Sequence, residues 1–315
     1  MLGVPATVNQ NCAAIVVRED VLANYVYQYL SHHYDDIRAL SHYGGIDHLN
    51  SALVREIKLP LPPLAEQRKI AAILGTWDAA IAAAERLVAA LRARKQALMQ
   101  RLLTGEVRFP GFEGEWEVKP FDCIFERVTR KNSIGNTNVL TASGQHGLVS
   151  QTEYFNRSVA GADLQGYYLI KRGEFAYNRS SSDGYPYGAI KQLEDYDAGI
   201  LSTLYLCFRL ADETCDAIFY RHFFEAGGLD QGIYSIAQEG ARNHGLLNVS
   251  VSDFFGLEIP VPASEEQRRL ASFFDTVDEE IARSVQYTKL LQAQKRGLMQ
   301  RLLNGEVRVA GGEER

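Results

Sequence analysis

Three short polar stretches contain the side chains best able to do chemistry in this chain: "IKRGE" from Ile170, "NRSSSDGYPYG" from Asn178 and "GARNHG" from Gly240. Arginine and asparagine can each make paired hydrogen bonds to a DNA base edge, and serine hydroxyls can hold phosphate. The candidate DNA contacts are therefore Lys171, Arg172, Asn178, Arg179, Ser180, Tyr185, Arg242 and Asn243. Each stretch fits an ordinary polar turn equally well, and the sequence leaves both interpretations open.

Residue patterns for catalysis are missing from the sequence. It has no G-x-x-x-x-G-K-[ST] phosphate loop, no G-x-G-x-x-G fingerprint after a strand and no N-P-P-[FYW] methyltransferase signature. The seven histidines are scattered, and the four cysteines show no C-x-x-C spacing, which favours reduced, buried thiols. We expect no catalytic residue, no metal site and no bound cofactor. Without a secretory signal or an apolar run of about 18 residues, we also expect a cytoplasmic protein that crosses no membrane.

The charge of the chain is unevenly distributed. The net charge is −6, which does not suggest a nucleic-acid-binding protein by itself. Residues 109–262 carry 12 basic and 20 acidic side chains, whereas residues 63–108 carry 8 basic and 4 acidic ones. DNA binding by this chain would therefore depend on localised basic loops, or on a partner that brings positive charge.

The polar stretches lie next to one long internal repeat. Shifting the sequence by 200 residues aligns 58–108 with 258–308 without a gap, and 23 of these 51 positions are identical. Identity at this level in a non-repetitive stretch indicates duplication, and the period is much longer than that of a solenoid repeat. The duplicated element is a whole unit of domain plus connector.

Each copy of the repeat predicts a long helix. Apolar residues follow steps of 4 and 3 from Ile70 to Leu102, and again from Leu270 to Leu302. This heptad pattern is typical of a coiled coil, and each helix should span about 40 residues. We predict that the two helices pair within the chain and run antiparallel. Lys95 and Lys295 fall in the seam, where they either extend along their aliphatic stems or fix the register.

Several polar identities between the copies are not required by core packing. They are Glu66, Gln67 and Arg68 in the first copy and Glu266, Gln267 and Arg268 in the second. We predict that these residues bind a partner protein. Helix capping and local ion pairs are the alternative, and Ser264 with Gln267 fits a capping box.

The remaining sequence predicts two unequal globular parts. Strand-like runs and a short helix near 214–226 fill the segment between the long helices. The first 62 residues resemble only the end of that segment, at an offset of 193, so we expect a first domain that lacks its front. The predicted division is a domain remnant at 1–62, a first helix and linker at 63–108, a complete domain at 109–262, a second helix at 263–308 and a tail at 309–315.

The repeated motifs resemble those of one protein family. "IKLPLPPLAEQRKIA" from Ile57 and "LEIPVPASEEQRRLA" from Leu257 introduce the helices, and each helix ends in K-x-x-L-M-Q-x-L-L-x-G, from Lys95 and from Lys295. The chain thereby resembles the specificity subunits of type I restriction–modification systems. The resemblance implies an α+β protein, with mixed α/β target-recognition domains joined by two long antiparallel coiled-coil helices related by a pseudo-two-fold internal repeat.

The resemblance also implies a function and partners. Subunits of this family recognise a bipartite target in double-stranded DNA and bind methyltransferase subunits, which carry S-adenosylmethionine. A restriction and translocase subunit completes the complex, and the specificity subunit itself catalyses nothing. Two alternatives stay open: a structural adaptor that binds the methyltransferase but reads only a half-site, and a fragment of a single-chain restriction–methylation enzyme. The lack of a methyltransferase motif argues against the second.

Overall fold

The structure is a computed structural model, which describes residues 7, 14–40, 51–144, 146–155, 163–182, 184–237 and 247–309. The chain divides into two compact units. The first unit joins Met1–Leu91 to Glu280–Arg315, and the second unit is Arg92–Glu279. The division falls inside both long helices, so each unit contains one part of each helix.

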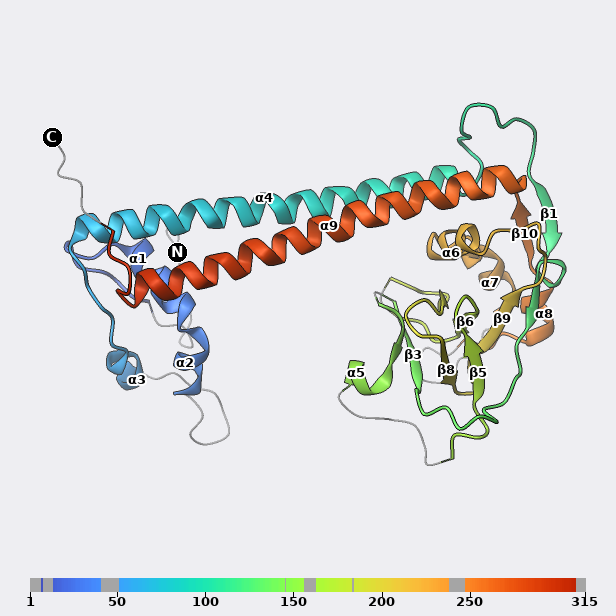
Figure 1. The fold of residues 1–315 in the computed structure, drawn as a ribbon, viewed down its shortest axis with the longest axis horizontal. Helices are drawn as coiled ribbons and strands as arrows, with labels where there is room; N and C mark the ends of the chain where they lie inside the picture. Colours follow the sequence, from blue (N-terminus) through green and yellow to red (C-terminus); the bar gives the residue numbers. More distant parts are fainter. Residues whose placement is uncertain are drawn as a thin grey trace. The chain divides into compact units, whose positions relative to one another are not determined.

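The duplicated segments form the two long helices, α4 (Leu64–Leu102) and α9 (Ser264–Leu303). Figure 1 shows them side by side within each unit. In the first unit the beginning of α4 lies against the end of α9, and in the second unit the end of α4 lies against the beginning of α9. The predicted antiparallel pairing is therefore confirmed. Seam residues such as Leu74 and Phe274 are fully buried, as the heptad pattern requires.

The first unit places three short helices near the beginning of α4. They are α1 (Ala23–His32), α2 (Tyr34–Ala39) and α3 (Ser51–Glu56). The apolar face of α1 packs on both long helices, in a buried cluster of Tyr25, Tyr29, Ile70, Leu74, Met299, Leu302 and Leu303. The aromatic residues of α1 thus seal the end of the helix pair in this unit.

The second unit is built around antiparallel strands. Its largest sheet has the order β2 (Phe125–Arg127), β9 (Leu206–Leu210), β6 (Phe175–Asn178) and β7 (Ala189–Gln192). Three two-stranded ladders adjoin it: β1 (Glu117–Pro120) with β10 (Glu258–Val261), β3 (Leu140–Ser143) with β4 (Gly147–Ser150), and β5 (Tyr168–Lys171) with β8 (Ala198–Leu201).

Short helices cover these strands: the 3₁₀ turn η1 (Phe121–Cys123), α5 (Gln151–Phe155), α6 (Ala217–Glu225), α7 (Asp230–Ile236) and α8 (Val251–Phe255). Phenylalanines from the sheet and from α6 pack in one core, in which Phe125 meets Phe208 edge-on. The side chain of Asp216 caps α6 by accepting the backbone N–H groups of Ile218 and Phe219. This cap fixes where α6 begins.

The strand-like runs expected between the long helices include β5 to β9 of the structure, but two details differ from the sequence analysis. The apolar run 199–210 forms two strands, β8 and β9, because a turn at Ser202–Tyr205 interrupts it. The capping box at Ser264 does not form. Gln267 instead binds Pro262 and Asp216, and the hydroxyl of Ser264 donates to the carbonyl of Thr214.

None of the helices in the described part of the chain has the length and apolar character needed to cross a membrane. Among the same residues, no group of three or more His, Cys, Asp or Glu side chains is arranged to hold a metal ion.

Candidate nucleic-acid interface

The same hydrogen-bonded frame occurs once in each unit, where a short helix meets a long one. Gln67 Oε1 accepts the backbone N–H of Leu22 at 2.8 Å, and Gln267 Oε1 accepts that of Asp216 at 2.8 Å. Each glutamine also donates to the proline carbonyl five residues earlier. Leu22 and Asp216 precede α1 and α6, so the structural offset is 194 rather than the 193 of the sequence overlay.

The glutamates shared by the two copies of the repeat form matched ion pairs. Glu66 accepts two hydrogen bonds from the guanidinium of Arg308, at 2.6 and 2.7 Å. Glu266 makes the same paired contact with Arg108, with 2.5 Å between Arg108 Nη2 and Oε2. The Arg308 side chain holds the pKa of Glu66 below its usual range. Both carboxylates are buried, so they fix the chain that leaves each long helix onto the start of the other.

These contacts bear on the six residues predicted to bind a partner. The four Glu and Gln side chains are buried and bonded within their own unit, as the alternative of local ion pairs describes. Arg68 and Arg268 are exposed on the long helices. Partner binding by this set stays a prediction, and Arg68 and Arg268 are the members whose side chains face solvent.

The seam lysines form a second matched pair of contacts. Lys295 Nζ lies 2.6 Å from Asp78 Oδ1 in the first unit, and Lys95 Nζ lies 2.6 Å from Asp278 Oδ1 in the second. Both lysine side chains are largely buried. Because a buried cation needs a specific partner, these pairs favour the register interpretation over simple extension along the stem.

The turn between β5 and β6 presents two adjacent cations to solvent. Glu174 Oε2 accepts the backbone N–H of Lys171 at 2.8 Å, and Gly173 has a φ of +85°, which tightens the turn. The Arg172 guanidinium lies 3.0 Å from Asp197 Oδ1, and both side chains are more than half exposed. A phosphate could displace this exposed carboxylate at little cost, because exposed ion pairs contribute about 0–1 kcal/mol.

The stretch 178–188 begins where β6 ends. Asn178 Oδ1 accepts the backbone N–H of Ser180 at 3.1 Å, in an Asx turn. Arg179 donates to the carbonyls of Leu204 and Val249, at 3.1 and 3.2 Å. Two of its nitrogens are therefore engaged within the domain, and Arg179 holds neighbouring loops together in this structure.

Tyr185 is tied into a network rather than presented on a free loop. Its hydroxyl lies 2.6 Å from Glu225 Oε1 and 2.8 Å from the carbonyl of Gly144, and it accepts a hydrogen bond from Lys191 Nζ at 2.9 Å. Lys191 is also paired with Glu225. Burial and the neighbouring Glu225 carboxylate raise the pKa of Tyr185.

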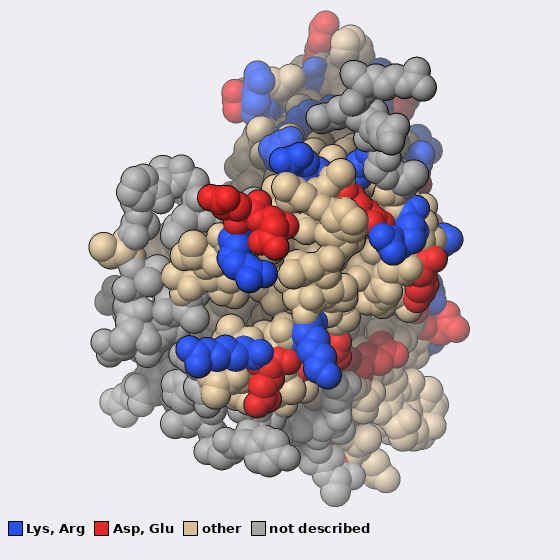
Figure 2. Space-filling model, turned by 90° about the vertical axis from the view of Figure 1, so that its left-hand side faces the viewer, with Lys and Arg blue, Asp and Glu red and all other residues tan. Residues whose placement is uncertain are grey.

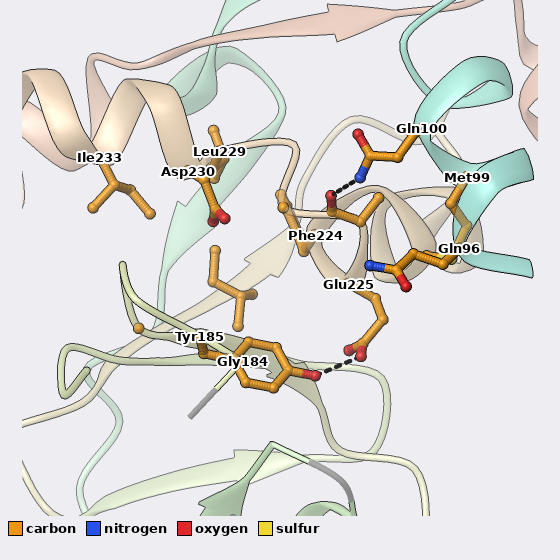
Figure 3. Close-up of a pocket in the computed structure, with 14 residues that line it drawn as sticks. Gln96, Met99, Gln100, Gly184, Tyr185, Phe224, Glu225, Leu229, Asp230 and Ile233 are labelled. Carbon is orange, nitrogen blue, oxygen red and sulfur yellow. Dashed lines mark hydrogen bonds between the residues drawn. The ribbon is translucent and has the colours of Figure 1, made fainter. Parts of the chain in front are cut away.

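A hollow of about 230 Å³ opens beside Tyr185. Figure 3 shows the tyrosine ring directed toward Glu225, and Gln100 of α4 donating to the carbonyl of Ala226. Asp230 of α7 also lines the hollow, and burial raises its pKa. Two carboxylates at this hollow would repel phosphate. The DNA backbone is therefore better matched to the exposed cations at Lys171 and Arg172.

The predicted DNA-contact residues do not form a single cluster. Lys171 and Arg172 precede β6, whereas Asn178, Arg179 and Ser180 stand at its other end. At about 3.3 Å per residue, the four residues of β6 separate the two groups by roughly 13 Å, so they lie at opposite ends of the strand. Arg242 and Asn243 lie outside the described residues.

Sequence reasoning missed the β3–β4 hairpin and Glu225 as neighbours of the stretch 178–188. A Cβ atom at Gly144 would come within 2.5 Å of the Tyr185 ring, so glycine permits this close approach. Neither residue belongs to a recognisable motif. The only available signal was the position of Glu225 at the end of the predicted helix near 214–226.

The first unit offers no continuous basic surface on the side that Figure 2 shows. Blue and red side chains are interspersed there around uncharged residues in the described part of that face. This mixture is consistent with the overall acidic charge of the chain.

Comparison with known proteins finds similar sequences among type I restriction specificity proteins. The profile of the type I restriction modification DNA specificity domain matches residues 1–92. The type I restriction enzyme MjaVIII specificity subunit of Methanocaldococcus jannaschii is 26% identical over 291 residues, which cover 84% of this chain and 65% of that subunit. The EcoR124I/EcoR124II specificity subunit of Escherichia coli is 34% identical over 80 residues, 25% of this chain and 20% of that subunit.

The chain is thus similar in sequence to the specificity subunits of type I restriction–modification systems. Its fold is also similar to solved structures. The type I S subunit from M. genitalium superposes with a TM-score of 0.51 at 13% identity, over 90% of this chain and 73% of that one. A chain from a study of the assembly and conformational transition of the type I R-M system superposes with a TM-score of 0.54 at 14% identity, over 92% and 73%. The chain spans less than two thirds of the length of the curated relatives it matches.

Proposed function

We propose that this chain is the DNA-sequence specificity subunit of a type I restriction–modification complex. In this proposal it recognises a target in double-stranded DNA, docks methyltransferase subunits and catalyses nothing itself. S-adenosylmethionine would be bound by the methyltransferase, and a restriction and translocase subunit would join the same complex. The observation that carries the proposal is the frame of Gln67 and Gln267, which occurs once in each unit of a chain that resembles these subunits.

We further propose that residues 109–262 act as the target-recognition domain, with 1–62 as the end of a first such domain. All ten strands named above lie in the second unit, and the described residues of the first unit contain no strand. Loops that extend from a rigid sheet can be held in place for base recognition, whereas loops between short helices have less support. The turn at Lys171 and Arg172 and the Asx turn at Asn178 support this assignment.

The methylated motif of host DNA tests the function directly. Genomic DNA from cells that carry the chain should show one adenine or cytosine methylation motif that disappears when the gene is disrupted. Restoring the wild-type gene should restore the motif, and so should a variant carrying Arg209→Ala. Arg209 is a half-exposed cation paired with Glu126 on the same unit, and it is not among the proposed DNA contacts. A methylation pattern that is unchanged by disruption would refute the proposal.

A further inference from the structure

Trp116 occupies a defined place in the second unit. Its indole Nε1 donates to Glu266 Oε2 at 3.0 Å, and the guanidinium of Arg108 lies 5.3 Å from its ring centroid. The ring also lies against Gly105, where a Cβ atom would be 3.4 Å from three ring atoms. The glutamate, the arginine and the glycine all belong to the duplicated sequence, but the tryptophan does not.

The residues that follow Trp116 continue as a strand beside these contacts. Residues Glu117–Pro120 form β1, which pairs antiparallel with β10, and Glu117 lies opposite Val261. In this arrangement Val261 is only 8% exposed. Trp116 and β1 therefore act together, because the indole fills the space at Gly105 while the strand covers the backbone edge of β10.

The first unit has the same arrangement of glutamate, arginine and glycine, but no tryptophan lies against it among the described residues. Glu66 binds Arg308 as Glu266 binds Arg108, and Gly305 has a φ of +75°, close to the +76° of Gly105. A Cβ atom at Gly305, however, would meet no atom within 4 Å. At this place the first unit has a hollow of about 300 Å³, lined by residues that include Tyr25, Pro60, Glu66, Ile70, Leu302 and Arg308.

The backbone edge next to this hollow lacks a partner strand in the described part of the chain. Residues 58–61 are the counterpart of β10, and they pair with no strand there. The consequence is visible at Leu61, which is 47% exposed, whereas its counterpart Val261 is 8% exposed. The carbonyls of Lys58 and Pro60 are already held by Tyr29 and Tyr25, so the segment is fixed in place.

We propose that this hollow and the edge 58–61 form a docking site for an extended peptide segment led by tryptophan. The indole would enter the hollow, donate to Glu66 and lie against Gly305 and Arg308. The residues after it would pair with the amides of Leu59 and Leu61, which adds a strand to an exposed edge. The chemistry of the docked segment is inferred from Trp116 and β1, which fill the equivalent place in the second unit.

A labelled peptide tests the proposal on the full chain. The probe is a fluorescein-labelled peptide with the sequence of residues 112–121, FEGEWEVKPF, and binding is measured by fluorescence anisotropy. We expect saturable binding that weakens at least tenfold when the tryptophan of the peptide is replaced by alanine. Hydrogen exchange should show protection of the amides of Leu59 and Leu61 when the peptide is bound. Equal binding of both peptides, or no binding, would overturn the proposal.

Two protein variants locate the site. Leu61→Asp places a charge on an already exposed edge residue and should weaken peptide binding, whereas Leu87→Asp, at a similarly exposed residue of α4, should not. A chain that ends at Val309 should bind the peptide within twofold of the full chain. Binding that requires removal of residues 310–315 would assign the hollow to the tail of the chain, and protection of β10 instead of 58–61 would place the peptide in the second unit. Either result would overturn the proposal.

Discussion

The contact between Lys295 and Asp78 gives an asymmetric prediction. The lysine side chain is 13% exposed and the aspartate side chain is 45% exposed. Asp78→Ala would leave the ammonium group poorly hydrated, which costs about 3–5 kcal/mol for a fully buried pair and about 0–1 kcal/mol for an exposed one. With one partner half-exposed, we expect about 1–3 kcal/mol. Lys295→Met leaves an aspartate that water can reach, and should cost about 1 kcal/mol or less.

Gln28 increases the effect of Asp78→Ala. Its amide Nε2 donates to Asp78 Oδ2 at 2.6 Å, and the residue is 1% exposed. Losing the acceptor leaves a buried amide without a partner, which adds about 1–3 kcal/mol. Asp278 is the nearest comparison, because it has the same lysine contact, while His222 Nδ1 lies 3.9 Å from its Oδ2 in place of the hydrogen-bonded glutamine. Asp278→Ala should therefore destabilise its unit less than Asp78→Ala destabilises the first.

Urea unfolding followed by circular dichroism would measure these free energies. Hydrogen exchange on peptides of α4 and α9 would assign each loss to one unit. The expected order of destabilisation is Asp78→Ala, then Asp278→Ala, then Lys295→Met. If Asp78→Ala and Lys295→Met cost the same, or if both cost less than about 0.5 kcal/mol, the lysines merely extend along their stems and the register interpretation is wrong.

Three further predictions concern the second unit. Burial lowers the pKa of His222 to about 4, so the unfolded chain binds a proton that the folded chain does not. This contribution to stability is complete above about pH 6.5 and is lost as the pH falls toward 4, by up to about 3 kcal/mol; His222→Gln should flatten that slope in acid titrations. Gly188 has a φ of +82°, and a Cβ atom there would lie 2.3 Å from the Asn178 carbonyl, so Gly188→Ala should lower the thermal midpoint by several degrees; an unchanged midpoint would argue against this backbone geometry. Burial raises the pKa of the Cys207 thiol to about 12, so iodoacetamide should label exposed Cys123 well before Cys207, and equal rates would contradict the burial.

The long helices were predictable because one physical signal dominates them. The 4-3 spacing of apolar residues from Ile70 to Leu102 predicts a buried seam, and its repetition 200 residues later predicts a partner helix. The ion pair of Lys95 with Asp278 was not identified from the sequence, although both residues are identical in the two copies. Its partners become clear only when the antiparallel register is applied, which places each lysine opposite the aspartate of the other helix.

The candidate DNA interface was less predictable, since its geometry depends on long-range packing. The stretch 178–188 was singled out by composition, but nothing local indicates that Arg179 binds the carbonyls of Leu204 and Val249. The β3–β4 hairpin was missed because its short strands alternate weakly and contain glycine and serine. Lys171 and Arg172 lie in a tight turn between two strands, as the sequence pattern predicts, and their contact with DNA stays a prediction.

Selection of randomised DNA duplexes tests most directly whether the second unit reads bases. The chain, assembled with the methyltransferase subunit of its own host, would be compared with a Lys171→Ala, Arg172→Ala, Asn178→Ala variant, and with Arg209→Ala as the control. Our account predicts that wild type and control select the same base-specific segment. The triple variant should lose that preference, at about 1–3 kcal/mol per lost base contact, and bind with a weaker salt dependence. Selection of the same bases by the triple variant would contradict the account.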